Sequence, residues 1–136
     1  MMSDKPEQAR SGKPAGATTI LVVDDSQDIR GLFHTALQRQ GYKVLLAADG
    51  ESALQVFQQH RGVIQLVVID VVMPGMSGLK LAAKLLTLRP DIKVLFVSAF
   101  VQETTLRGKL RAEDRFLAKP IAPERLITKV QEMLAA

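Results

Sequence analysis

Short runs of apolar residues alternate along the chain with stretches in which apolar residues recur every three or four positions. The apolar runs cover residues 20–23, 44–47, 66–69, 94–97 and 116–117. Runs that are apolar throughout predict strands buried on both faces, which requires a parallel sheet with helices on either side. The pattern therefore predicts an α/β domain: a flavodoxin-like, doubly wound, five-stranded parallel sheet in the order 2-1-3-4-5, with five helices.

Helical periodicity and capping residues place the predicted helices between and after these strands. They are expected around Ile29–Leu37, after Asp49, after Ser77, from Gln102 to Ala112, and from Pro123 onward. The periodic positions place Leu32 and Leu86 on faces that pack against the sheet. Gly108 lies inside the fourth of these helices, which has few large apolar residues, so we expect it to be the least stable element.

Residues 1–18 differ from the rest of the chain. Lys, Glu, Gln, Ser, Gly and Pro dominate this segment, and no apolar periodicity appears in it. Such a segment cannot bury enough apolar surface to offset the entropy that it loses on ordering. We therefore predict a disordered N-terminal tail over residues 1–18 and a single domain over residues 19–136.

The composition narrows the class of protein. The chain of 136 residues contains no cysteine, which excludes disulfides, thiolate nucleophiles and zinc–thiolate sites. No apolar stretch approaches the roughly 20 residues that span a bilayer, and the N-terminus lacks an apolar signal core. The net charge of +4 comes from scattered lysines and arginines, a distribution that disfavours nucleic-acid binding. We expect a cytoplasmic protein that does not bind membranes.

Polar residues stand where the predicted strands end. Asp24 and Asp25 follow the first strand, Asp70 the third, Ser98 the fourth and Lys119 the fifth. The carboxyl ends of parallel strands share one edge of the sheet, where doubly wound folds bind ligands. Taken singly, an aspartate pair or a serine is often a helix cap, and a lysine before proline often marks a turn. Together, in this order, they indicate one functional site.

The carboxylates of Asp24, Asp25 and Asp70 predict a divalent metal, because three neighbouring carboxylates repel one another unless a cation joins them. Mg²⁺ prefers hard oxygen ligands and suits a chain without cysteine. An aspartate beside Mg²⁺ can attack a phosphoryl donor in line and become an aspartyl phosphate. We therefore expect Asp70 to take up a phosphoryl group whose oxygens contact Lys119 and the Ser98 hydroxyl.

Four segments of the sequence carry a resemblance to a known family. They are Ile20-Leu-Val-Val-Asp-Asp-Ser26, Val68-Ile-Asp-Val-Val-Met-Pro-Gly-Met-Ser-Gly78, Val97-Ser-Ala99 and Phe116-Leu-Ala-Lys-Pro120. With these segments the chain resembles the receiver domain of response regulators in two-component signalling, the CheY-like superfamily. The resemblance covers the chain from Thr19 to the C-terminus.

The resemblance implies a role for each residue of the site. Asp70 would accept phosphate from a histidine kinase or a phosphotransfer protein. Asp25 would bind Mg²⁺, or Mn²⁺ in its place, directly, and Asp24 would act as a ligand or through water. The backbone carbonyl of Val72 would complete the protein ligands. A cis peptide bond between Lys119 and Pro120 would aim the lysine at the phosphoryl group.

The resemblance also implies a switch. Ser98 would move toward the phosphoryl group, and Phe116 would turn into the space that Ser98 leaves. This motion would change the surface formed by the helix at 102–112, the fifth strand and the last helix, which would contact a downstream protein. Plain core packing is the alternative role for Phe116. The resemblance leaves open a monomer or a weak dimer.

Several alternatives remain at this stage. The chain ends at Ala136, which leaves no room for an output domain, so we expect either a free-standing regulator or a receiver fragment of a hybrid histidine kinase. A phosphorylation-independent pseudo-receiver that only binds proteins is a third reading, although the acidic and lysine positions are all present. A phosphatase of the haloacid-dehalogenase type needs two aspartates at a spacing that Asp24-Asp25-Ser26 lacks. We expect no enzymatic activity beyond self-phosphorylation and dephosphorylation.

Overall fold

Five parallel strands form one sheet in the order β2-β1-β3-β4-β5 in the computed structural model of the protein, which describes residues 18–99 and 115–136. The strands are β1 (Thr19–Val23), β2 (Lys43–Ala47), β3 (Leu66–Asp70), β4 (Lys93–Ser98) and β5 (Phe116–Ala118). Each neighbouring pair is parallel and in a continuous register. The predicted fold class and strand order are confirmed.

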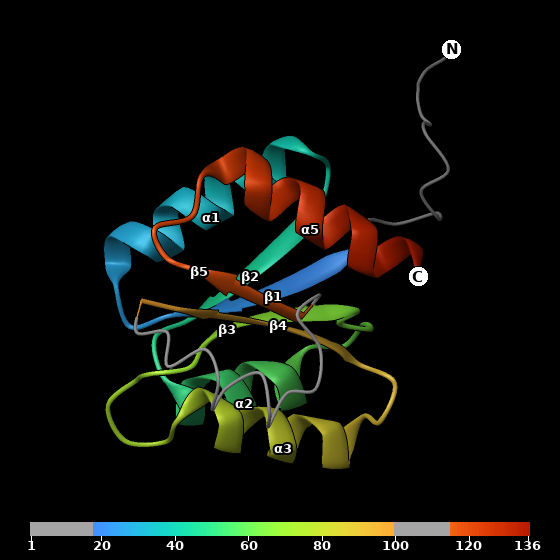
Figure 1. Ribbon diagram of the computed structural model, residues 1–136. Coiled ribbons are helices and arrows are strands. Elements are labelled where there is room, and N and C mark those ends of the chain that lie inside the picture. The colour runs from blue at the N-terminus through green and yellow to red at the C-terminus, as the bar shows by residue number, and fades with distance from the viewer. Residues whose placement is uncertain (1–17, 100–114) are drawn as a thin grey trace.

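Helices cover both faces of the sheet. They are α1 (Gln27–Arg39), α2 (Gly50–Gln59), α3 (Gly78–Leu88) and α5 (Pro123–Ala135). Helices α1 and α5 lie on one face, and α2 and α3 lie on the other (Figure 1). The described residues thus hold four of the five predicted helices, and none of the four is long and apolar enough to cross a membrane. The helix predicted over 102–112 and nearly all of the predicted tail lie outside the described residues.

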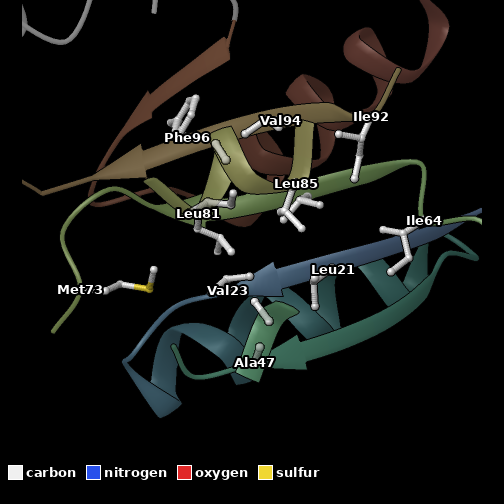
Figure 2. Close-up of a cluster of buried hydrophobic side chains, with 14 of the residues drawn as sticks. Leu21, Val23, Ala47, Ile64, Met73, Leu81, Leu85, Ile92, Val94 and Phe96 are labelled. Atoms are coloured by element: carbon white, nitrogen blue, oxygen red, sulfur yellow. The ribbon is translucent and has the colours of Figure 1, made fainter. Parts of the chain in front are cut away.

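The hydrophobic core consists of two clusters, one on each face of the sheet. Successive side chains of a strand point to opposite faces, and β1 is buried throughout, so it contributes to both clusters. Leu21 and Val23 pack toward α3, where Leu81 and Leu85 meet them (Figure 2). On the other face the cluster includes Ile20, Val22, Phe33, Leu37, Leu126 and Val130. Burial of both strand faces explains why the strands read as uninterrupted apolar runs.

Three helices begin with a side-chain cap at the carboxyl edge of the sheet. Ser26, Asp49 and Ser77 each accept a hydrogen bond from the backbone N–H three residues later. Helix α5 instead begins with Pro123 in its first turn, after Ala122, which offers no side-chain hydrogen bond. Helix α1 begins at Gln27, soon after β1 ends at Val23, so the loop that carries Asp24 and Asp25 is short.

Two leucines expected to pack against the sheet are largely exposed. Leu32 on α1 is 43% exposed and Leu86 on α3 is 39% exposed. Leu86 lies beside a cavity that Ile92 and Phe96 also line. Periodicity identifies the apolar side of a helix. How many residues of that side the sheet buries depends on how the helix packs against it. The predicted burial of these two residues is therefore wrong.

Candidate functional site

The polar residues that end the strands meet at the carboxyl edge of the sheet. Asp24 follows β1 and Asp70 ends β3, and these two strands are neighbours, with Val23 paired to Ile69. Ser98 ends β4, the next strand, and Lys119 follows β5. The strand order reverses beside β1, which makes this edge the topological switch point of the fold. The fold thus brings together residues that lie up to 95 positions apart in the sequence.

Three carboxylates form a compact cluster at this edge. Asp24, Asp25 and Asp70 each offer one carboxylate oxygen, and these oxygens all lie within 4.8 Å of one another. Asp24 and Asp70 are buried, whereas Asp25 is exposed. The cluster predicted from the sequence is therefore present as a spatial group.

Lys119 neutralises part of the charge of this cluster. Its Nζ donates to Asp24 Oδ2 at 2.9 Å and to Asp70 Oδ2 at 3.3 Å. Its backbone N–H donates to the carbonyl of Ser98 at 2.8 Å, which fixes the start of the loop after β5. The peptide bond between Lys119 and Pro120 is cis, as the resemblance implies. Lys119, which follows β5, thus contacts the loop after β1 and the last residue of β3.

Burial and neighbouring charge shift two pKa values at the site. Desolvation raises the pKa of the Asp70 carboxyl, the negative charge of Asp24 raises it further, and Lys119 offsets only part of this rise. Burial alone lowers the pKa of the Lys119 ammonium, but the hydrogen bond and the charge of Asp24, together with Asp70, hold it above the usual value. The ionised Asp70 carboxylate therefore carries an unfavourable free energy that another cation would relieve.

Asp24 is held by four hydrogen bonds. Its N–H donates to Ala47 O at 3.2 Å, its Oδ1 accepts from the N–H of Ser26 at 2.9 Å, and its Oδ2 accepts from Lys119. Its backbone carbonyl accepts from Nη1 of Arg30 at 2.7 Å. Sequence reasoning assigned no role to Arg30, because only the first turn of α1 brings it back over the strand end.

Ser98 and Phe116 belong to the neighbouring strands β4 and β5. The side chain of Ser98 is fully buried at the end of β4, one residue beyond Val97, which pairs with Asp70. Phe116 opens β5 opposite Phe96 and packs, partly buried, against the cluster on the α2 and α3 side. This packing matches the alternative reading of Phe116 as a core residue, and its role as a switch stays a prediction.

Gly78 is a second residue to which sequence reasoning gave no role. It begins α3, and its N–H donates to Val71 O at 2.9 Å. A Cβ atom at this position would overlap the carbonyl oxygen of Asp70 and lie 2.8 Å from the Cα of Val71. Only glycine therefore lets α3 start this close to the strand end that carries Asp70.

The donor set suits Mg²⁺. Oxygen ligands of two buried aspartates and one exposed aspartate are hard donors, and the exposed side of the cluster leaves room for the waters that Mg²⁺ retains. The backbone N–H of Val72 donates to Asp70 Oδ1 at 3.2 Å, so the residue that the resemblance names as a ligand lies at the cluster. Its carbonyl as a metal ligand stays a prediction.

Comparison with known proteins identifies the family. A family model described as the response regulator receiver domain matches residues 20–131. The chain belongs to this family. Receiver domains are signalling domains of two-component systems rather than classical enzymes.

Relatives of this receiver domain occur in proteins of different size. The sensor kinase CckA of Brucella abortus is 40% identical over 121 residues, which cover 88% of this chain and 13% of that protein. The uncharacterized transcriptional regulatory protein YbdJ of Bacillus subtilis is 36% identical over 116 residues, or 85% of this chain and 50% of that protein. The chain thus spans half or less of the length of these relatives.

Solved receiver structures share the fold. The chemotaxis protein CheY4 of Vibrio cholerae superposes with a TM-score of 0.74 at 31% identity, over 87% of this chain and 99% of that one. The response regulator TrrA of Thermotoga maritima, solved in complex with Mg²⁺-BeF, has a TM-score of 0.74 at 33% identity, over 85% of this chain and 98% of that one. Each of these likenesses covers at least 85% of this chain.

Replacing Lys119 with methionine should destabilise the metal-free receiver domain. The variant leaves Asp24 and Asp70 without the cation that both contact, and we expect the free energy of unfolding at neutral pH to fall by about 2–3 kcal/mol. The folded-state pKa of Lys119 is raised, so this contribution is fully present below the usual lysine pKa, about 10.4, and is lost only as pH rises beyond it.

Urea denaturation with and without Mg²⁺ checks this expectation. Mg²⁺ should restore part of the loss, because a ligand that binds only the folded state stabilises it. Lys84→Met, which removes an exposed lysine from α3, is the matched control and should change the stability by less than about 0.5 kcal/mol. Equal losses in the two variants would mean that the contacts of Lys119 with the aspartates contribute nothing.

Proposed function

We propose that this receiver domain is the phosphoacceptor of a two-component phosphorelay, with Asp70 as the residue that takes up the phosphoryl group. The observation that carries the proposal is the position of Lys119, whose Nζ contacts the carboxylates of both Asp24 and Asp70 at the switch point of the sheet. The pKa of the buried Asp70 carboxyl is raised, so its ionised form destabilises the folded state, and two further carboxylates lie beside it. A group of residues that lowers stability in this way is explained by a chemical role, and phosphoryl transfer is a role that uses all of them.

The donor in this proposal is a histidine kinase or a phosphotransfer protein. A carboxylate oxygen of Asp70 attacks the phosphorus of a phosphohistidine, so that a P–O bond forms while the P–N bond breaks and the imidazole keeps the electron pair. Asp24, Asp25, Asp70 and the Val72 carbonyl would hold Mg²⁺ or Mn²⁺, which would supply positive charge to the phosphoryl oxygens. The product is an aspartyl phosphate, and no further substrate is turned over.

Lys119 and Ser98 would hold the transferred group. Nζ of Lys119 already reaches Asp70 Oδ2, so it can pair with a phosphoryl oxygen on that carboxylate. The Ser98 hydroxyl would donate to another oxygen from the neighbouring strand β4. A shift of Ser98 would free space for Phe116 and change the surface of β5 and α5 for a downstream protein. The remainder of this predicted output surface, at 102–112, lies outside the described residues.

Two protein architectures fit this function. The likeness to a sensor kinase favours a receiver that is part of a hybrid histidine kinase, and the likeness to transcriptional regulatory proteins favours a receiver in a response regulator. The phosphorelay chemistry at Asp70 is the same in both. A pseudo-receiver that binds proteins without phosphorylation is the competing function, and the phosphorylation experiment separates it from the proposal.

Incubation with acetyl phosphate tests the proposal directly. In the presence of Mg²⁺ we expect the intact mass to rise by about 80 Da, the mass of one phosphoryl group, and excess EDTA should prevent the rise. Reduction with borohydride followed by peptide mapping should locate the modified aspartate at position 70. No mass gain, together with no binding of Mg²⁺, would favour the phosphorylation-independent module.

A further inference from the structure

The turn between β1 and α1 contains an arginine whose side chain holds the backbone next to the exposed aspartate of the cluster. Nη1 of Arg30 donates to the carbonyl oxygen of Asp24 at 2.7 Å, a short distance for a hydrogen bond from a charged donor. Arg30 belongs to the first turns of α1, and its own N–H donates to Ser26 O at 3.0 Å. Arg30 therefore binds the turn twice, through its side chain at Asp24 and through its backbone N–H at Ser26.

This contact acts on Asp25 through the geometry of the peptide bond. The carbonyl of Asp24 lies in the same rigid plane as the N and Cα atoms of Asp25, so fixing the carbonyl fixes where the Asp25 side chain starts. The other three hydrogen bonds of Asp24 use its N–H, which belongs to the preceding peptide plane, and its carboxylate. Among the hydrogen bonds of Asp24 within residues 18–99 and 115–136, only the bond from Arg30 holds the plane that leads to Asp25.

Asp25 depends on this support more than its neighbours do. Asp24 and Asp70 are buried and each accepts hydrogen bonds through both carboxylate oxygens. The Asp25 side chain is exposed and, within residues 18–99 and 115–136, has no ion pair or hydrogen bond. Its carboxylate is therefore positioned by the backbone alone, and a metal that binds it relies on that backbone.

We propose that Arg30 is a positioning residue for the metal site, one that orients Asp25 for Mg²⁺ by holding the carbonyl of Asp24. The inference rests on the proposed function, because it assumes that Mg²⁺ binds at Asp24, Asp25 and Asp70. Arginine suits the task because its planar guanidinium presents several donors in a fixed arrangement, so little side-chain freedom is lost when one of them bonds. Arg30 thus strengthens the site although its positive charge repels Mg²⁺.

The positioning role and the charge of Arg30 have opposite effects on Mg²⁺ affinity, which makes the inference testable. Loss of a positive charge beside three carboxylates strengthens Mg²⁺ binding by electrostatics alone. Loss of the support for Asp25 weakens it, and groups that orient metal ligands typically contribute 10-fold or more to affinity. We expect Arg30→Met to raise the dissociation constant for Mg²⁺ about 10-fold and Arg30→Lys, which keeps a donor, to raise it less.

The experiment measures Mg²⁺ binding by calorimetry on the full chain and on the variants Arg30→Met, Arg30→Lys and Arg39→Met. Arg39 is an exposed arginine in the last turn of α1, so Arg39→Met removes the same charge from the same helix and is the matched control. Phosphorylation by acetyl phosphate is followed in parallel as a function of Mg²⁺ concentration. Arg30→Met should need about 10-fold more Mg²⁺ for half-maximal rate, with the rate at saturating Mg²⁺ nearly unchanged.

Each outcome bears on a different part of the inference. Arg30→Met with the affinity of Arg39→Met, or with tighter Mg²⁺ binding, overturns the positioning role while Mg²⁺ binding by the parent protein leaves the proposed function standing. Failure of the parent protein to bind Mg²⁺ overturns both. Thermal unfolding of each variant is measured alongside, and a merely structural loss would lower the saturated rate of Arg30→Met and Arg30→Lys alike without shifting the Mg²⁺ dependence.

Discussion

The Asp70→Asn variant should take up no phosphoryl group from acetyl phosphate, a loss of at least about 100-fold in rate relative to the parent protein. Asparagine has nearly the shape of aspartate and keeps the acceptor oxygen for the N–H of Val72, so the fold around the site is preserved. Its neutral amide is not a nucleophile toward phosphorus. Intact-mass measurement of both proteins after equal incubation with acetyl phosphate and Mg²⁺ gives the comparison.

The same substitution should stabilise the protein at neutral pH. Burial and the charge of Asp24 raise the pKa of Asp70 above its unfolded value, so the ionised carboxylate destabilises the folded state. This cost is complete at neutral pH and disappears as pH falls through the folded-state pKa toward the unfolded value of about 3.9. We expect the Tm of Asp70→Asn to exceed that of the parent by about 3 °C at pH 7 and the difference to vanish in acid.

Asp91→Asn is the matched control for both measurements. The Asp91 side chain is 80% exposed and pairs only with Arg89 in the described structure, so its amide variant should be phosphorylated at the parental rate and show the parental Tm. A mass gain in Asp70→Asn equal to that of the parent would show that another residue accepts the phosphoryl group, and Asp25 would be the first residue to test. A lower Tm for Asp70→Asn would show that Lys119 more than compensates the buried charge.

Gly78→Ala should disrupt the site from the helix that faces it. The new Cβ would overlap the carbonyl oxygen of Asp70 and lie 2.8 Å from both Ile69 Cγ2 and Val71 Cα. Two of these three neighbours are backbone atoms, so the strand end or the start of α3 must shift. We expect a loss of about 3 kcal/mol in the free energy of unfolding and a fall of at least about 10-fold in the rate of phosphoryl uptake at 25 °C.

Gly31→Ala provides the opposite control. A Cβ on Gly31, inside α1, would meet no atom within 4 Å, and alanine favours a helix interior over glycine by about 1 kcal/mol. Urea denaturation should therefore show Gly31→Ala to be more stable than the parent and Gly78→Ala to be less stable. If Gly78→Ala were as stable as Gly31→Ala, the protein would accommodate a Cβ atom beside the Asp70 carbonyl oxygen, and the steric argument for Gly78 would be wrong.

Several features of this protein follow from the sequence without any knowledge of tertiary contacts. Strands that are apolar throughout must be buried on both faces, and a parallel sheet with short connections has few topologies, so the order β2-β1-β3-β4-β5 could be predicted. The same reasoning places Asp24, Asp70, Ser98 and Lys119 at one edge, because each follows a strand. The side-chain caps at Ser26, Asp49 and Ser77 depend only on nearby residues, so they could also be predicted from the sequence.

Only the tertiary structure decides how these residues meet. The contacts of Lys119 with both Asp24 and Asp70 depend on how far the loop after β5 reaches across the sheet. The bond from Arg30 to Asp24 depends on the angle at which α1 leaves its strand, and the closeness of Gly78 to Asp70 on the packing of α3. The pattern of a sequence reports which side of an element is apolar and where the element ends, both local properties of the chain. Distances between elements result from packing that many residues determine together, so the sequence specified the members of the site and the packed fold specified their contacts.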